Sequence, residues 1–132
     1  MTTPSIDAQI TFLDTVDLSE TARFYETIME LPLVVDQGQC RIYQTGEDAY
    51  VGFCERDLGE SAAEFAAAHV ILTLVTDDVD GWHAHLKNLG VEIEKPPNEN
   101  PRYGIYQCFA RDPNGYLIEI QRFLDENWRG GR

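Results

Sequence analysis

The sequence has no apolar run long enough to cross a membrane. None of its stretches approaches the roughly 20 consecutive apolar residues that a bilayer-spanning helix needs. Its first ten residues, MTTPSIDAQI, also lack the basic start and apolar middle that mark a secretory signal. We therefore expect a protein of the cytoplasm that does not bind membranes.

Positive charge is scarce as well. Ten Lys and Arg residues stand against 23 Asp and Glu residues, which gives a formal net charge of −13, and Lys87 and Lys95 are the only lysines. A surface this acidic repels phosphate backbones, and no basic stripe offsets the repulsion. These features argue against nucleic-acid binding. They predict an acidic, soluble protein, with adaptation to high salt as a second explanation.

Cysteine is the third scarce residue type. Cys40, Cys54 and Cys108 are an odd number, have no metal-like spacing, and each falls within a predicted strand. A free thiol in such a place packs as a small apolar side chain. We therefore expect three reduced core cysteines rather than a disulfide or a nucleophile.

The sequence has ample material for a hydrophobic core. Apolar residues make up 43% of it and aromatic residues 11%, whereas a disordered chain with this much charge would have fewer. A length of 132 residues suits a single domain that spans residues 1–132. Because strand-like and helix-like patterns are interspersed, we expect an α+β fold.

The first half of the chain reads as a strand, a helix and three strands. The first strand is predicted at residues 9–13, and Asp17 or Ser19 can cap the helix that follows. Pro32 helps to end this helix. Its apolar stripe, at spacings of three and four, is Leu18, Ala22, Tyr25, Ile28 and Met29. Three short strands are predicted at residues 33–36, 40–44 and 49–54.

The second half repeats this order. A strand at residues 69–75 leads to Asp78 and a helix that Gly90 is placed to end. The apolar face of that helix carries Val79, Trp82, Leu86 and Leu89. A short strand at 91–94, a rigid proline-rich loop at 95–101 and strands at 104–111 and 116–122 complete the half.

The two halves align residue by residue, which indicates a duplication. Asp17 corresponds to Asp78 and Ile10 to Ile71 at an offset of 61, and residues 49–53 correspond to 116–120 at an offset of 67. Pairing the halves would cover their concave faces and leave a cavity between them. We expect a first module at 8–55, a linker at 56–68 with some helix at 61–67, a second module at 69–123, and a mobile tail at 124–132 that Trp128 would restrain by docking.

Several segments, in order along the repeat, form a recognisable pattern. They are Asp17-Leu18 with Phe24-Tyr25, Asp78-Val79, Leu89-Gly90-Val91 and, most specific, the run DPNGYLIEI at residues 112–120. Together they resemble the glyoxalase/bleomycin-resistance/dioxygenase (vicinal oxygen chelate) superfamily over about residues 10–123. The resemblance implies two βαβββ modules that form an open, cup-shaped barrel, often completed as a homodimer. The family includes lactoylglutathione lyase, extradiol dioxygenases, thiol transferases and bleomycin-binding proteins.

The resemblance also implies four metal-ligand positions on the first and last strands of the modules. They fall here on Ile10, Gly52, Ile71 and Glu119, and only Glu119 has a side chain that can ligate. A catalytic divalent ion needs about three protein ligands from His, Asp or Glu. We therefore predict no cofactor. A divalent metal held by Glu119, His69 and a third, unassigned group is the alternative.

Glu119 is the candidate catalytic residue. Strand alternation puts Leu117, Glu119 and Gln121 on one face, with Ile118 and Ile120 on the other against a helix. If the first face lines the cavity, Glu119 is an acid–base or substrate-anchoring group. Otherwise it is a hydrogen-bonded remnant of the family's site.

Further candidates line the expected cavity. His69 shares a strand face with Ile71 and would reach Glu119, unless it lies in solvent at the strand end. Tyr103 combines an apolar ring with a polar tip, which suits the binding of organic ligands. The alternative is that this ring only packs at the edge of the sheet. Gln107 shares a face with Ile105 and Phe109, in a register that a shift of one residue would invert. The predicted substrate-binding residues are Ile10, Phe12, Tyr50, Gly52, His69, Ile71, Arg102, Tyr103 and Gln107.

Three functions are compatible with these features. The leading hypothesis is a metal-independent member of the superfamily that binds a small organic molecule in the cup, as a sequestering, resistance-type protein or as an enzyme of unassigned reaction. The second is a metal-dependent lyase, isomerase or dioxygenase with displaced ligands. The third is an acidic interaction module that meets a basic partner protein.

Overall fold

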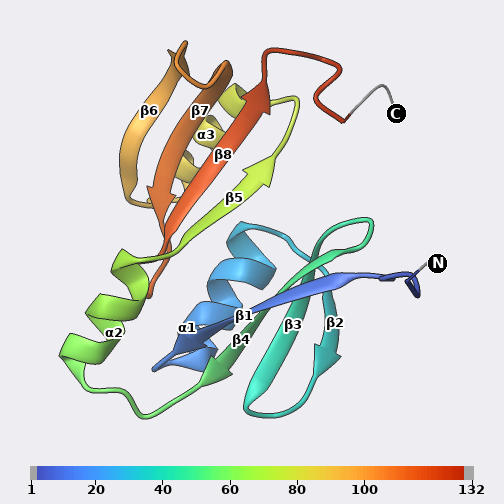
Figure 1. Ribbon diagram of the computed structural model, residues 1–132. Helices are drawn as coiled ribbons and strands as arrows, with labels where there is room; N and C mark the ends of the chain where they lie inside the picture. The colour runs from blue at the N-terminus through green and yellow to red at the C-terminus, as the bar shows by residue number, and fades with distance from the viewer. Residues whose placement is uncertain (1–2, 130–132) are drawn as a thin grey trace. The chain divides into compact units, whose positions relative to one another are not determined.

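The computed structural model describes residues 3–129, which fold as two similar compact units (Figure 1). The units are Met1–Ala66 and Ala67–Arg132, called unit 1 and unit 2 below. Each contains a mixed four-stranded sheet and a helix that follows its first strand. The predicted α+β fold with two βαβββ modules is therefore confirmed.

Unit 1 forms a sheet with the strand order β1-β4-β3-β2. Strand β1 is parallel to β4, and the other neighbouring strands are antiparallel. The chain between β1 and β2 forms a helix whose last turn has π-helical hydrogen bonds. The elements are β1 Gln9–Thr15, α1 Leu18–Arg23, η1 Phe24–Ile28, β2 Leu33–Asp36, β3 Cys40–Gly46 and β4 Ala49–Glu55.

The helix of unit 1 begins where a side chain can satisfy its free backbone N–H groups. A carboxylate oxygen of Asp17 accepts a hydrogen bond from the Glu20 N–H at 3.0 Å, so Asp17 rather than Ser19 is the cap. The predicted stripe is buried except at Ile28, which is half-buried, and Tyr25 stacks on Phe53 of β4 with the ring centroids 4.4 Å apart. This packing holds the helix against one face of the sheet.

The end of this helix depends on an unusual backbone conformation. The Met29 N–H donates to the Phe24 carbonyl and the Leu31 N–H to the Tyr25 carbonyl, both at 2.9 Å. Glu30 lies between these donors with a φ of 56°, the left-handed conformation that favours glycine. In unit 2 the corresponding helix ends with Gly90, whose φ is 77°. Unit 1 therefore carries strain where unit 2 has none.

Unit 2 repeats the arrangement with the strand order β5-β8-β7-β6. Its elements are β5 Ile71–Val75, α3 Val79–Asn88, β6 Ile93–Asn100, β7 Ile105–Arg111 and β8 Leu117–Phe123. Helix α3 is capped by Asp78, as predicted, and packs against β6, β7 and β8 (Figure 1). Val79 and Leu86 are buried, whereas Leu89 at the helix end is 51% exposed. The predicted apolar face is therefore wrong at Leu89.

The strand registers confirm the internal alignment. In unit 1, Ile10 pairs with Tyr50 and Phe12 with Gly52. In unit 2, Ile71 pairs with Leu117 and Thr73 with Glu119. Both offsets predicted from the sequence relate these pairs, so Gly52 and Glu119 occupy equivalent places.

The proline-rich segment after α3 is a strand, not the loop predicted at residues 95–101. Strand β6 lies at the edge of its sheet, where a proline that lacks an N–H costs no hydrogen bond on the outer side. The register shifts between Ile93 and Lys95 and again between Lys95 and Asn98, which accommodates the two prolines. The next strand begins at Ile105, and Arg102 and Tyr103 lie in the turn before it.

The cysteine prediction is wrong for two of the three residues. Cys40 and Cys54 are directly opposite each other on β3 and β4, with Cα atoms 4.1 Å apart, and form a disulfide. The strands were predicted singly, and only their register brings these two thiols together. Cys108 is free and buried, and burial raises the pKa of its thiol to about 11. Disulfides persist mainly in oxidising compartments, so the expected cytoplasmic location stays a prediction.

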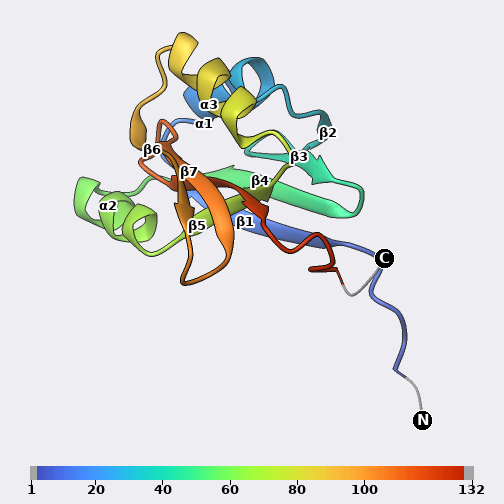
Figure 2. The same ribbon diagram turned by 90° about the horizontal axis from the view of Figure 1, so that it is seen from above.

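The linker and the described parts of the two termini lie outside the two sheets. The linker contains α2, Glu60–Ala68, close to the predicted helical stretch. Residues 3–8 are exposed and run away from the sheet of unit 1 (Figure 2). Trp128 docks as expected, with its ring stacked on Phe123 at a centroid distance of 4.5 Å, and the last three residues of the predicted tail, 130–132, lie outside the described residues. No helix within residues 3–129 is long and apolar enough to span a membrane.

Candidate functional site

The face of the unit 2 sheet opposite α3 carries a pocket of about 560 Å³. Strand alternation creates this face, because Ile118 and Ile120 of β8 are buried toward the helix side while Glu119 and Gln121 line the pocket. We call this face of the sheet, opposite α3, the open face of unit 2. Its lining combines apolar, amide and charged side chains: Ile71, Lys95, Asn100, Tyr103, Ile105, Gln107, Phe109, Glu119, Gln121 and Phe123.

Two neighbouring rows of side chains cross the open face. The register places Thr73, Glu119, Phe109 and Lys95 opposite one another on β5, β8, β7 and β6. The row beside it contains Gln121, Gln107 and Asn98. Across the sheet, the first row therefore presents a hydroxyl, a carboxylate, an aromatic ring and an ammonium group in that order. The second row presents three amides.

The two charges of the first row are not neutralised by protein partners. Thr73 Oγ1 donates to Glu119 Oε1 at 2.9 Å, and Lys95 Nζ lies 5.9 Å from the centre of the Phe109 ring. Among residues 3–129, neither Glu119 nor Lys95 forms an ion pair. The nearby guanidinium of Arg111 is already paired, with its Nε 3.3 Å from a carboxylate oxygen of Glu94. Glu119 and Lys95 are therefore available to a ligand.

Four of the predicted site residues lie together on this open face: Ile71, Tyr103, Gln107 and Glu119. Two others do not line the pocket. The guanidinium of Arg102 stacks over the Tyr103 ring at 5.4 Å, and His69 lies in the turn after α2, because β5 begins only at Ile71. The argument that His69 shares a strand face with Ile71 is therefore wrong.

The remaining predicted residues form the corresponding face of unit 1. They are Ile10, Phe12, Tyr50 and Gly52, on the paired strands β1 and β4. The Phe12 ring covers Gly52, since a Cβ added to this glycine would lie 2.5 Å from Phe12 Cε1. An aromatic ring thus fills the place that corresponds to the Glu119 carboxylate, and unit 1 offers an apolar face where unit 2 offers a polar one.

The sequence-based candidates omitted Lys95, Asn100 and Gln121, and treated Phe109 only as a neighbour of Gln107. Lys95 and Asn100 were assigned to a loop, so their side chains could not be placed on a strand face. Both side chains could have been assigned to a strand face if residues 93–100 had been predicted as an edge strand. Phe109 and Gln121 follow directly from the alternation that identified Gln107 and Glu119.

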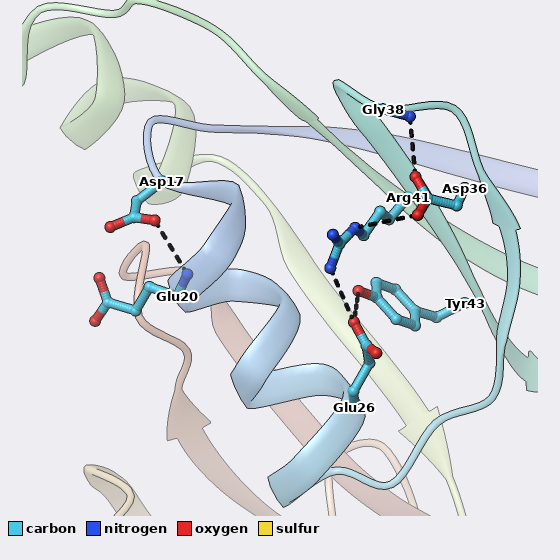
Figure 3. A network of polar contacts seen from close by, with 7 residues as sticks. All are labelled: Asp17, Glu20, Glu26, Asp36, Gly38, Arg41 and Tyr43. Atoms are coloured by element: carbon cyan, nitrogen blue, oxygen red, sulfur yellow. Dashed lines mark hydrogen bonds and ion pairs between the residues drawn. The ribbon is translucent and has the colours of Figure 1, made fainter.

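A polar network in unit 1 has a structural role (Figure 3). The hydroxyl of Tyr43 donates to Glu26 at 2.8 Å, and Arg41 pairs with the same carboxylate at 3.3 Å and with Asp36 at 3.9 Å. Burial, together with the hydrogen bond to Glu26, raises the pKa of Tyr43. Because Tyr43 is fully buried and Arg41 pairs with both Glu26 and Asp36, the network fastens η1 to β3.

The residues present do not fit the metal that the family resemblance implies. Three of the four ligand positions are Ile10, Gly52 and Ile71, which cannot donate an electron pair to a metal. Within the described part of the chain, no group of three or more His, Cys, Asp or Glu side chains is arranged to hold an ion. Glu119 is thus the only one of the four positions whose side chain can bind a metal ion.

The fold and the register of the duplicated strands define a family. The chain belongs to the Glyoxalase/Bleomycin resistance protein/Dioxygenase superfamily, whose family model matches residues 9–120. The "Uncharacterized protein YraH" of Bacillus subtilis (strain 168) is 25% identical over 122 residues, which cover 82% of this chain and 91% of that protein.

Two solved structures show the same fold. A glyoxalase/bleomycin resistance protein/dioxygenase from Nocardioides is 18% identical, with a TM-score of 0.72, and the match covers 96% of this chain and 88% of that one. Lactoylglutathione lyase from Agrobacterium tumefaciens is 22% identical, also with a TM-score of 0.72, over 95% of this chain and 98% of that one. At these identities the similarity establishes the fold and not the activity.

Proposed function

We propose that this chain binds a small organic molecule on the open face of unit 2 without the help of a metal ion. The observation that carries the proposal is the composition of the pocket there. Aromatic and aliphatic side chains supply most of the contact area, and a few amides and charged groups point into the same space, which is typical of ligand sites. Glu119 contributes a carboxylate that can accept a hydrogen bond from a bound molecule.

A screen of small aromatic compounds by thermal shift, followed by NMR titration of the hits, tests this function. A ligand at a hundredfold excess over its dissociation constant should stabilise the fold by about 2.7 kcal/mol. Phe109→Ala should weaken every hit, because this ring lines the pocket on the strand between those of Glu119 and Lys95. Phe65→Ala removes an exposed ring from α2 and serves as the control.

Two results would count against the proposal. Hits that bind Phe109→Ala as tightly as the wild type would place the site elsewhere. A stoichiometric transition metal in natively purified, tag-free protein that is lost in Glu119→Ala would show that metal-dependent chemistry takes place here instead.

A further inference from the structure

We infer that the ligand of the open face is an amphoteric aromatic compound, with an acidic group at one end of a ring and a protonated amine at the other. This inference rests on the proposed function and names the class of molecule that the site takes. It follows from the order of side chains in the row Thr73, Glu119, Phe109 and Lys95.

The row places opposite charges on either side of an aromatic ring. Glu119 lies one strand from Phe109, and Lys95 lies one strand from it on the other side. Two strand spacings separate the charged residues, or about 10 Å between their backbones. Among residues 3–129, no ion pair joins these two side chains. A rigid molecule with complementary ends can contact both charges at once while its ring packs on Phe109.

The position of Lys95 strengthens the argument. The chain has only two lysines among its 132 residues and a net charge of −13, so its surface repels anions. One of those two ammonium groups nevertheless lines this pocket, close to the Phe109 ring. A carboxylate of the ligand would find its main attraction at Lys95.

The other end of the row suits a hydrogen-bond donor. Oε1 of Glu119 already accepts from Thr73, and its second oxygen has no hydrogen-bond partner among residues 3–129. An ammonium group of the ligand would donate to that oxygen in a charge-assisted hydrogen bond. The amides of Gln107 and Gln121, in the neighbouring row, can bind polar substituents on the ring.

The test compares three probes in NMR titrations at constant ionic strength. 4-(Aminomethyl)benzoate carries both ends, benzylamine lacks the acid, and 4-methylbenzoate lacks the amine. The two-ended probe should bind about tenfold more tightly than either one-ended probe, the size expected for one additional charge-assisted contact. Lys95→Met should remove its advantage over benzylamine, and Glu119→Gln its advantage over 4-methylbenzoate.

Two variants control for net charge. Lys87→Met removes the other lysine, which is exposed on α3, and Glu92→Gln neutralises an exposed carboxylate before β6. Both should keep the wild-type order of affinities.

Equal affinity for the three probes, or a preference that survives Lys95→Met and Glu119→Gln, would overturn the inference. If Phe109→Ala still weakens the binding of aromatic compounds in that case, the proposed function stands without it. Failure of all three probes to bind would also overturn the inference, and the broader screen would then decide the proposed function separately.

Discussion

Single residues decide how the two helices of the duplicated units end. Glu30 and Gly90 each adopt the left-handed conformation at the end of the helix of their unit, with φ angles of 56° and 77°. A residue with a Cβ is strained in this conformation, whereas glycine adopts it freely. The same backbone feature is therefore strained in one copy and relaxed in the other.

Glu30→Gly should raise the free energy of unfolding by about 1 kcal/mol, because it relieves the strain at the end of η1. Gly90→Ala should lower it by a similar amount, although a Cβ there meets no atom within 4 Å. Urea denaturation followed by circular dichroism measures both. A loss of stability in Glu30→Gly would mean that its side chain contributes more than the strain costs.

Tyr43→Phe should lower the free energy of unfolding at neutral pH by about 1 kcal/mol, because Glu26 loses a hydrogen bond. The pH dependence should change too, since the pKa of Tyr43 is raised in the folded state. Above about pH 10 the unfolded chain releases this proton while the folded protein keeps it. Stability then falls by about 1.4 kcal/mol per pH unit for this residue.

Urea denaturation between neutral pH and about pH 11 tests this expectation. Tyr43→Phe should show a shallower alkaline loss of stability than the wild type. Tyr103→Phe, at a tyrosine that is 64% exposed, should keep the wild-type slope. Identical slopes for the wild type and Tyr43→Phe would show that Tyr43 does not cause the alkaline loss.

At the scale of elements, the sequence predicts where strands and helices lie better than it predicts which strands pair and in which register. Asp17, Asp78 and Gly90 mark helix ends through local hydrogen bonds and backbone preference, so they could be identified directly. Strand β6 could not, because two prolines are compatible with a strand only at the edge of a sheet, and the sequence does not reveal which strand is an edge. The disulfide was missed for the same reason, since it depends on the register of β3 against β4.

The disulfide closes the hairpin of β3 and β4 at its open end. Cys40 and Cys54 are 14 residues apart in the sequence, and a bond that closes a loop of this size stabilises a fold by about 3 kcal/mol. Cys54→Ser, or reduction with dithiothreitol, should therefore lower the free energy of unfolding by about that amount. Cys108→Ala should retain its sensitivity to the reductant, and a wild type that is indifferent to dithiothreitol would contradict the expectation.

At the scale of the whole molecule, charge and duplication could both be read from the sequence. The offsets of 61 and 67 aligned the two halves, and with them Gly52 and Glu119, and the strand registers of both units agree with that alignment. The pocket on unit 2 could be predicted only in part. Gln107 and Glu119 follow from alternation, but Lys95 reaches the open face only through the bulged register of β6.

A net charge of −13 should make stability depend on salt. Raising NaCl from about 0.01 M to about 1 M shortens the Debye length from about 30 Å to about 3 Å and screens the repulsion between carboxylates. The free energy of unfolding should rise by on the order of 1 kcal/mol, the combined size of a few weak surface repulsions. Sucrose at equal osmolality is the control, because it is excluded from the protein surface but does not screen charge. Equal effects of NaCl and sucrose would rule out charge screening as the cause.

The pairing of Phe12 with Gly52 in one unit, and of Thr73 with Glu119 in the other, bears on how such a protein can change over evolutionary time. The side chains that hold each helix to its sheet lie on one side, and these two pairs lie on the other. A duplicated gene could therefore replace the polar pair of one copy without loosening either hydrophobic core. One unit can then acquire new side chains on its open face while the other unit keeps its original function. Relatives with this fold should therefore differ most on their open faces and least on the sheet faces that pack against the helices.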